Sequence, residues 1–521
     1  MNYYKILDKR FFTIFFIPLI IGSISVFSFQ PYNITWINFL TLPTIFLLLT
    51  FITKRSQSVY RKKPYLKNLF FVGYFFGVGF FLTGIYWIAN SLTYDESFKY
   101  YIPLAIILIP LFLGIFYGIA TLVVGPYIKN NFSSILLFCS SFALIDYLRA
   151  KILTGFPWNM WAYSWSWFIE VFQILNPIGL FAFNLLSLTL FCAPLLLIFK
   201  KNKKNYVLTF LISILFLANY IFGSYLLNSK KETYELDKSQ NLSRNIKIIA
   251  TNFDLKYNLS LQEIEQSLKK LIRYSDPERG QSTIFIWPEG VFTGYNFSEI
   301  KKYKDLFKNN FSTEHLIIFG INTQDENSNK FYNSLLVINN DLKILYKYDK
   351  KKLVPFGEFL PFESFLNRFG LKKITQGHGT FSQGYKNQNF VDKNLNILPL
   401  ICYEIIFPEL IQKASSKTNL IINISEDAWF GGSIGPKQHF AKAIFRAVES
   451  NIYIARAANK GVSAFIDNTG NIIKSLEPNE KGNIELKIPL INNNSKNKND
   501  LIFFILLFTY MIIFFTLRNK L

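Results

Sequence analysis

The chain has 521 residues, of which 50% are hydrophobic and 18% aromatic, and its formal net charge is +22. A chain this long and apolar is not a single soluble domain, and its composition indicates a membrane protein with a soluble part. The basic residues lie mostly in short loops between apolar runs or are scattered over the polar half. The positive charge therefore does not indicate nucleic-acid binding.

Seven apolar runs precede residue 228, and each is close to the roughly 20 residues needed to cross a bilayer. The first run resembles a signal peptide, but no small-residue cleavage site follows it and further spans do, so we predict an uncleaved helix. The predicted spans are Phe11–Phe29, Ile34–Ile52, Leu69–Ser91, Tyr101–Val124, Phe132–Arg149, Asn176–Phe199 and Tyr206–Leu227.

Lysine and arginine residues gather in two of the loops, over residues 54–67 and 200–204. With the N-terminus in the cytoplasm, both loops are cytoplasmic, as the positive-inside rule requires. Seven crossings then place residues 229–499 outside the cytoplasm, and a last apolar run, Leu501–Leu517, returns the chain. We expect a membrane domain over residues 1–228, an extracytoplasmic domain over 229–499 and a C-terminal transmembrane helix over 500–521.

The segment after the fifth span carries a charged pair and several tryptophans. Asp146 and Arg149 are three residues apart at the end of a span, where an unpaired charge is costly. For Trp158 and the tryptophans near it, an interfacial aromatic belt is the simpler explanation, and a place beside the substrate is the alternative. Three glycines of the third run, Gly77, Gly79 and Gly84, fit close helix packing as well as they fit a functional motif.

In the polar half, short β-rich runs alternate with helical patterns, which predicts a layered α/β sandwich. A capping box at Ser260 and Glu263 predicts a helix to about Tyr274, and another helix is predicted from Pro436 to about Ser450. The predicted strands are Ile246–Thr251, Thr283–Trp287, His315–Ile321, Ser334–Asn339, Ile397–Cys402, Leu420–Ile424, Val462–Ile466 and Ile484–Ile488.

Reactive side chains follow three segments of this half. One strand ends at Cys402, another is followed by Glu289, and a turn rich in proline and glycine carries Lys350 and Glu358. A lone cysteine is more often a small buried hydrophobe than a nucleophile. However, a base, a cation and a thiol at the ends of separate segments are the groups that thiol-based acyl transfer needs. No cluster has metal-ligand spacing and no glycine loop would hold phosphate, so we expect neither metal nor cofactor.

These motifs resemble a known signature. Trp287-Pro-Glu289, Lys350 with Leu353-Val-Pro-Phe-Gly-Glu358, and Cys402-Tyr-Glu404 are similar to the Glu-Lys-Cys motifs of the nitrilase (carbon–nitrogen hydrolase) superfamily. With the membrane spans, the chain resembles the membrane branch, the apolipoprotein N-acyltransferases. The resemblance implies eight transmembrane helices and an αββα sandwich outside the cytoplasm.

The resemblance also implies roles for single residues. Glu289 would be the general base, Lys350 would stabilise the oxyanion and Cys402 would be the nucleophile. The residues that the resemblance places in support of this triad are Glu358, Tyr403 and Glu404.

The function that the resemblance implies is transfer of a fatty acyl chain from a membrane phospholipid, through a thioester on Cys402. The acceptor would be the α-amino group of the diacylglyceryl-cysteine of an apolipoprotein. The place would be a bacterial inner membrane, with the catalytic domain periplasmic and both termini cytoplasmic. Two alternatives remain: a membrane-tethered amidase or nitrilase for small soluble substrates, and a non-catalytic interaction protein.

Several positions depart from the family pattern: Asp146 replaces a usual Glu, Lys352 a usual His, and Glu426 a usual Asn. Tyr257 stands where a tryptophan is expected, and we assign it, with Trp158, to a substrate- or membrane-facing set. Four phenylalanines complete this set: Phe356, Phe359, Phe362 and Phe365. A core helix face would explain their spacing, but the prolines and glycine among them oppose a regular helix. We therefore predict a mobile apolar arm that touches lipid.

Overall fold

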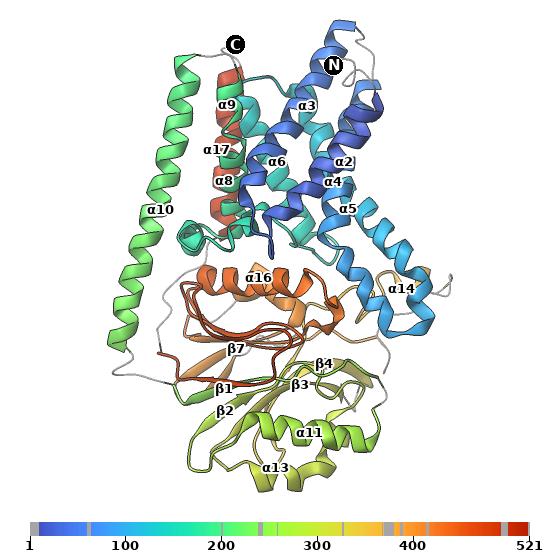
Figure 1. Cartoon of the computed structure of the whole chain (residues 1–521), viewed down its shortest axis with the longest axis vertical. Helices are drawn as coiled ribbons and strands as arrows, with labels where there is room; N and C mark the ends of the chain where they lie inside the picture. Colours follow the sequence, from blue (N-terminus) through green and yellow to red (C-terminus); the bar gives the residue numbers. More distant parts are fainter. Residues whose placement is uncertain are drawn as a thin grey trace. The chain divides into compact units, whose positions relative to one another are not determined.

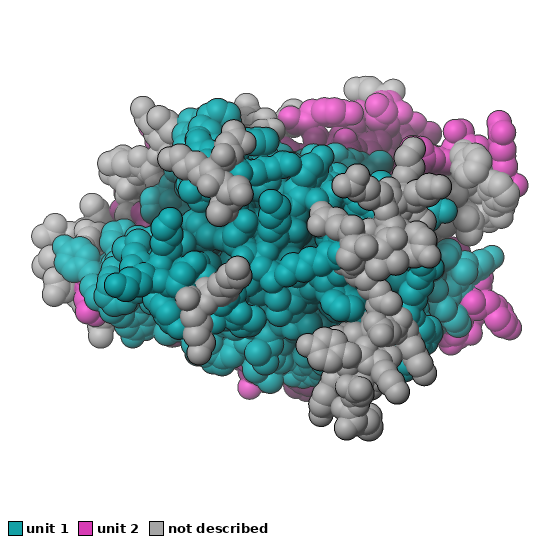
Figure 2. Space-filling view, turned by 90° about the horizontal axis from the view of Figure 1, so that it is seen from above, with its two compact units in different colours: residues 1–89, 101–226, 497–521 teal, residues 90–100, 227–496 magenta. Residues whose placement is uncertain are grey.

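The structure, a computed structural model, describes residues 10–59, 64–199, 202–237, 243–257, 259–325, 328–366, 368, 380–385, 389–412, 416–490 and 499–518. The chain forms two compact units (Figures 1 and 2). Unit 1 consists of residues 1–89, 101–226 and 497–521, and unit 2 of residues 90–100 and 227–496. Unit 2 thus contains the short segment 90–100, which we had expected in the membrane domain.

Unit 1 is built from apolar helices (Figure 1). Eight helices in the described part of the chain are long and apolar enough to cross a membrane, which confirms the predicted number. They are Phe11–Ser28, Thr35–Lys54, Tyr65–Gly84, Glu96–Tyr127, Phe132–Lys151, Leu180–Ile198, Lys203–Ser229 and Asp500–Arg518. The third is shorter than predicted, because helix α4 ends at Gly84 and a 3-10 helix, Tyr86–Tyr94, follows.

The α-helices that lie wholly or mostly in unit 1 are α2 (Ile17–Ser25), α3 (Asn38–Val59), α4 (Pro64–Gly84), α5 (Ile102–Val124), α6 (Phe132–Lys151), α7 (Leu175–Ile178), α8 (Leu180–Cys192), α9 (Leu195–Ile198), α10 (Lys203–Asp237) and α17 (Asn499–Arg518).

Glycines let α4 approach its neighbours. A β-carbon at Gly77 would lie 2.9 Å from the Cα of Gly114 in α5, and one at Gly79 would clash with the carbonyl oxygen of Leu19 in α2. These glycines therefore serve close helix packing.

Of the four tryptophans after α6, for which an interfacial belt was the simpler prediction, three are buried and Trp167 is 41% exposed. Trp158, Trp161 and Trp165 are each at most 1% exposed. The ring of Trp158 lies 4.7 Å from that of Trp87, and Arg149 donates to the carbonyl oxygen of Trp158 at 2.8 Å. The side chain of Trp158 is thus covered by protein in this structure, and its place in the substrate- or membrane-facing set stays a prediction.

Unit 2 is an αββα sandwich, as predicted. One sheet has the strand order β12-β1-β2-β3-β4-β5 and the other β11-β10-β9-β8-β7-β6. The strands are β1 (Asn245–Ala250), β2 (Thr283–Ile286), β3 (Leu316–Asp325), β4 (Lys330–Ile338), β5 (Ile344–Asp349), β6 (Phe390–Asp392), β7 (Leu395–Ile401), β8 (Leu420–Glu426), β9 (Tyr453–Asn459), β10 (Ser463–Ile466), β11 (Ile472–Leu476) and β12 (Gly482–Leu486). The α-helices are α11 (Leu261–Ser275), α12 (Phe297–Ile300), α13 (Lys304–Asn310), α14 (Glu363–Leu366), α15 (Pro408–Gln412) and α16 (Gly435–Ser450).

The layers follow from the alternation of side chains along each strand. Ile284 and Ile286 of β2 point into the core between the two sheets, together with Ile397 of β7. Phe285, between them, points to the other face and packs with residues of α11 and α13. Helix α16 lies on the outer side of the second sheet (Figure 1).

Parallel strands bring the candidate residues to strand ends. Strands β1, β2 and β3 are parallel, as are β7, β8 and β9. Glu289 follows β2, Cys402 follows β7, and Glu426 is the last residue of β8. Because the carboxyl ends of parallel strands meet at one edge of a sheet, Cys402 and Glu426 are neighbours in the fold.

Candidate active site

Glu289 is held by three separate elements. Trp287, two residues before Glu289, is held in place because its indole N–H donates to Ser275 Oγ at 2.9 Å. The side chain of Glu289 is 11% exposed. Its Oε1 accepts a hydrogen bond from Asn333 Nδ2 at 2.8 Å, and its Oε2 accepts one from the backbone N–H of Glu426 at 3.1 Å. A carboxylate fixed in this way presents a defined oxygen to an incoming proton.

Lys350 directly follows β5 and is 1% exposed. Its Nζ lies 2.8 Å from Glu358 Oε1 and 3.6 Å from Glu289 Oε1. Burial alone would lower the pKa of Lys350, but the carboxylates of Glu289 and Glu358 outweigh it and raise the pKa above its usual value. The lysine therefore remains a cation inside the protein.

Asn333, in β4, joins the two carboxylates. Its Nδ2 donates to Glu289 and also to Glu358 Oε1, at 2.7 Å. The other oxygen of Glu358 accepts the backbone N–H of Val354 at 2.8 Å, which closes the turn after Lys350. In the sequence, Asn333 fits the family pattern and is interpreted as supporting the fold, and its amide within a buried apolar strand is the signal of a closer role.

Cys402 begins a 3-10 helix, Cys402–Ile406, at the end of β7. Its φ is +48°, which is uncommon for a residue with a β-carbon and is often found at functional sites. Burial raises the pKa of the thiol, Glu289 raises it further, and Lys350 lowers it. The net effect is a pKa above the usual value for a thiol, so the thiol is protonated at neutral pH.

Glu404 ties the lysine turn to the cysteine turn. Its Oε1 accepts the backbone N–H groups of Lys351 at 2.7 Å and Lys352 at 3.2 Å, and its Oε2 accepts that of Ile401 at 2.8 Å. The hydroxyl of Tyr348 donates to the same carboxylate at 2.9 Å. Glu404 therefore connects the backbone after Lys350 with the backbone before Cys402. The ring of Tyr403 contacts that of Phe407 at 5.0 Å.

A second buried cluster supports the end of β8. Glu426 accepts hydrogen bonds from Asn459 Nδ2 at 2.9 Å and from the backbone of Ala428 at 3.1 Å. Burial would raise the pKa of Asp427, but Arg456 at 2.8 Å and His439 at 3.0 Å bring it down to about 2. This ion pair fastens the turn that follows Glu426.

The predicted substrate- or membrane-facing residues of unit 2 divide by exposure. Phe356 is 47% and Phe362 72% exposed, and both have positive φ, so they belong to turns and not to a core helix face. Phe359 is half-buried, and the side chain of Phe365, in α14, lies outside the described residues. Tyr257 is half-buried, with its ring 6.3 Å from that of Trp429.

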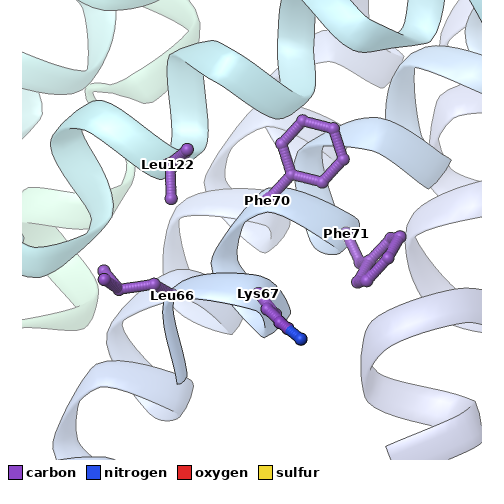
Figure 3. A pocket seen from close by; sticks show the side chains of 5 residues that line it. All are labelled: Leu66, Lys67, Phe70, Phe71 and Leu122. Carbon is purple, nitrogen blue, oxygen red and sulfur yellow. The ribbon is translucent and has the colours of Figure 1, made fainter. Parts of the chain in front are cut away.

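A pocket of unit 1 has a different character. Its volume is about 390 Å³, and it is lined by Leu66, Lys67, Phe70, Phe71 and Leu122 (Figure 3). This lining contains no thiol and no carboxylate, so the pocket cannot supply a nucleophile and a base. The described part of the chain has no group of three or more His, Cys, Asp or Glu residues that could hold a metal ion.

Comparisons with known proteins identify the family of the chain. Residues 227–492 match the carbon-nitrogen hydrolase family, and residues 21–193 match the apolipoprotein N-acyltransferase N-terminal domain. Proteins named apolipoprotein N-acyltransferase are 31% identical in Allorhizobium ampelinum, over 80% of this chain and 79% of the relative, and 30% identical in Brucella melitensis, over 90% and 88%. A solved nitrilase-superfamily structure from Saccharomyces cerevisiae is 20% identical, with a TM-score of 0.36, over 48% of this chain and 91% of that one. The chain belongs to the apolipoprotein N-acyltransferase family.

Proposed function

We propose that this protein moves a fatty acyl chain from a membrane phospholipid to the α-amino group of the diacylglyceryl-cysteine at the N-terminus of an apolipoprotein. One observation carries the proposal: a buried Glu289–Lys350 pair beside the thiol of Cys402, in a chain with eight apolar helices. Relatives named for this activity match over most of the chain. The substrates are lipids or lipid-modified proteins, which suits an enzyme anchored in a bilayer.

The first half-reaction transfers the acyl chain to the enzyme. As Cys402 Sγ attacks the ester carbonyl of the phospholipid, Glu289 takes the thiol proton. The ammonium of Lys350 and the backbone N–H of Tyr403 stabilise the negative oxygen that develops. The carbon–oxygen ester bond then breaks, and Glu289 returns the proton to the leaving alcohol. The products are a lysophospholipid and a thioester on Cys402.

The second half-reaction uses the same groups with an amine. The α-amino group of the acceptor attacks the thioester carbonyl, and Glu289 takes a proton from its nitrogen. The carbon–sulfur bond breaks, the proton passes to the Cys402 sulfur, and an amide is formed. Because one site serves donor and acceptor in turn, the kinetics are ping-pong. Glu358, Asn333 and Glu404 hold Lys350 and Glu289 in place throughout.

The basic loops indicate on which side of the membrane each part of the protein lies. The relatives' name and the apolar helices fit an inner-membrane protein, and the basic loops at residues 54–67 and 200–204 favour a cytoplasmic side for both. The catalytic unit is then periplasmic and both termini are cytoplasmic. The exposed Phe356 and Phe362 are suited to contact with lipid, and Tyr257 to contact with a substrate.

Mass spectrometry of the intact protein tests the proposal. The purified full-length chain is incubated with phosphatidylethanolamine in detergent micelles, and we expect a mass increase of one acyl group on Cys402. Cys402→Ala should show no increase, and Cys139→Ala, which changes a buried membrane cysteine, should retain it. Adding a diacylglyceryl-cysteine peptide should discharge the adduct and yield an acylated peptide. Turnover of soluble amides without any lipid adduct would instead support a tethered amidase.

A further inference from the structure

The segment 90–100 is connected in sequence to the membrane helices α4 and α5, yet it packs within unit 2. Two of its side chains hold the turn that follows β8, a 3-10 helix over Asp427–Phe430. Asn90 Nδ2 donates to the carbonyl oxygen of Phe430 at 2.7 Å, and the hydroxyl of Tyr94 donates to the carbonyl oxygen of Ala428 at 2.5 Å.

The fit between segment and turn is close. The ring of Tyr94 meets that of Trp429 edge to face, with 5.2 Å between centroids. Gly431, just after the turn, has a φ of +58°, and a β-carbon there would lie 2.9 Å from Asn90 Nδ2. A residue other than glycine would therefore be strained at this position and would also displace Asn90.

The turn held by this segment reaches the catalytic base. The backbone N–H of Ala428 donates to Glu426 Oε1 at 3.1 Å, and the backbone N–H of Glu426 donates to Glu289 Oε2 at 3.1 Å. A path of hydrogen bonds and backbone thus runs from the Tyr94 hydroxyl, through residues 426–428, to the carboxylate of Glu289.

Electrostatics place the same segment beside the candidate site. Burial, and then the charge of Glu426, raise the pKa of Tyr94 to about 12, so its hydroxyl remains a donor at neutral pH. The pKa of Tyr257 is raised by burial and then by Glu426, Tyr94, Asp95 and Glu358. The charges near Tyr257 thus include residues of the segment and two carboxyl groups of the site, and its ring lies 6.3 Å from that of Trp429, which also contacts Tyr94.

We propose that Tyr94, assisted by Asn90, is a positioning residue for the catalytic base: by fixing the 426–430 turn it keeps Glu289 Oε2 directed to the thiol of Cys402. The proposal rests on the acyl-transfer function given above. Oε1 of Glu289 is used by Asn333 and lies beside Lys350, whereas Oε2 accepts the Glu426 N–H and retains a lone pair for the thiol proton. If the turn shifts, Oε2 shifts with it.

The test is Tyr94→Phe in the full-length protein, because it removes the hydroxyl and keeps the ring against Trp429. We expect the rate constant of thioester formation on Cys402, at saturating phosphatidylethanolamine in micelles, to fall about tenfold, since small misplacements of a reacting group are costly. The half-saturating lipid concentration and the unfolding temperature should equal those of the wild type. A purely structural role would lower the unfolding temperature and leave the rate of the folded protein unchanged.

Two further variants sharpen the test. Asn90→Ala should also slow thioester formation. Because both residues act through one turn, the rate constant of the double variant should fall by less than the product of the two single fold-reductions. Tyr100→Phe is the matched control, since Tyr100 belongs to the same segment and is 90% exposed. It should match the wild type.

The outcomes are distinct. If the wild type forms no adduct on Cys402, the acyl-transfer function fails, and the positioning role fails with it. If the wild type is acylated and both Tyr94→Phe and Asn90→Ala react at its rate, the positioning role alone is overturned. A loss of unfolding temperature with an unchanged rate would also overturn it, because Tyr94 would then only stabilise the fold.

Discussion

Both units bury a carboxylate with a cation, but the two clusters differ in what surrounds them. In unit 1, Asp146 accepts hydrogen bonds from Arg149 at 3.0 Å, Tyr117 at 3.1 Å and Asn184 at 3.0 Å. These donors come from α5, α6 and α8, so the network fastens three helices. In unit 2, the Glu289–Lys350 pair lies beside a thiol whose pKa responds to both charges.

The difference teaches that a buried ion pair does not by itself mark a catalytic site. Both pairs escape the cost of burying an unpaired charge, which is the general requirement. Of these two pairs, the one in unit 2 has a thiol close enough for both of its charges to act on the pKa of Cys402. Variants in each cluster can show whether the cluster of unit 2 serves the reaction and the cluster of unit 1 stabilises helix packing.

The largest effect is expected for Lys350→Met. This change removes the donor to the developing oxyanion, and thioester formation should slow by about 100- to 1000-fold. It also leaves Glu289 and Glu358 without their shared cation, so some stability is lost. Rapid-quench mass spectrometry of the Cys402 adduct measures the rate. Lys343→Met, at an exposed lysine just before β5, is the control, and a normal rate in Lys350→Met would remove the lysine from the mechanism.

Asp146→Asn tests the cluster of unit 1. It leaves Arg149 buried without a carboxylate, and we expect a loss of about 3 kcal/mol in the free energy of unfolding. Thioester formation by the folded fraction should be unchanged, since the network fastens helices. Asp146→Glu retains the charge and should recover part of the lost stability. Unfolding in detergent and the Cys402 acylation rate measure the two quantities, and a slower reaction at unchanged stability would contradict the fastening role.

Asp427 belongs to a buried ion pair of unit 2 to which, as for the cluster of unit 1, we assign a role in stabilising the fold. Its pKa in the folded protein, about 2, is below the roughly 3.9 of an unfolded aspartate. The pair therefore adds stability above about pH 4, and this contribution is lost as the pH falls toward 2, by an amount of about 2 kcal/mol. The unfolding free energies of the wild type and Asp427→Asn should converge in this range. A gap that stays constant down to pH 2 would contradict the assignment.

Much of the fold and site was predictable because the signals were local. Apolar runs indicated eight spans, and short buried strands ending in Cys402 and Glu289 indicated a sandwich with its chemistry at strand ends. Strand β9 was missed because its Ala455, Arg456 and Ala457 have low β-propensity. It forms because β10 and β8 pair with it, one on each side, and because Arg456 forms an ion pair with Asp427.

Other features depend on contacts between distant parts of the sequence. The abundance of tryptophans indicated an interfacial belt, whereas the side chain of Trp158 is buried and Arg149 donates to its carbonyl oxygen. Residues 90–100 are next to helices of unit 1 in the sequence, and their place in unit 2 depends on contacts with residues more than 300 positions away. The sequence indicated only a fold-supporting role for Asn333, since the carboxylates that it joins lie on other segments.

The smallest effect is expected for the double variant of Phe356→Ser and Phe362→Ser. Both side chains are exposed, so the change in unfolding free energy should stay within about 0.5 kcal/mol. If these rings contact lipid, the half-saturating phospholipid concentration should rise several-fold, while a short, water-soluble ester should acylate Cys402 at the wild-type rate. Leu261→Ser, at an exposed apolar residue that begins α11, is the matched control. An equal rise in that control would make the effect general to apolar surface, and unchanged lipid use in the double variant would deny the two phenylalanines a part in lipid binding.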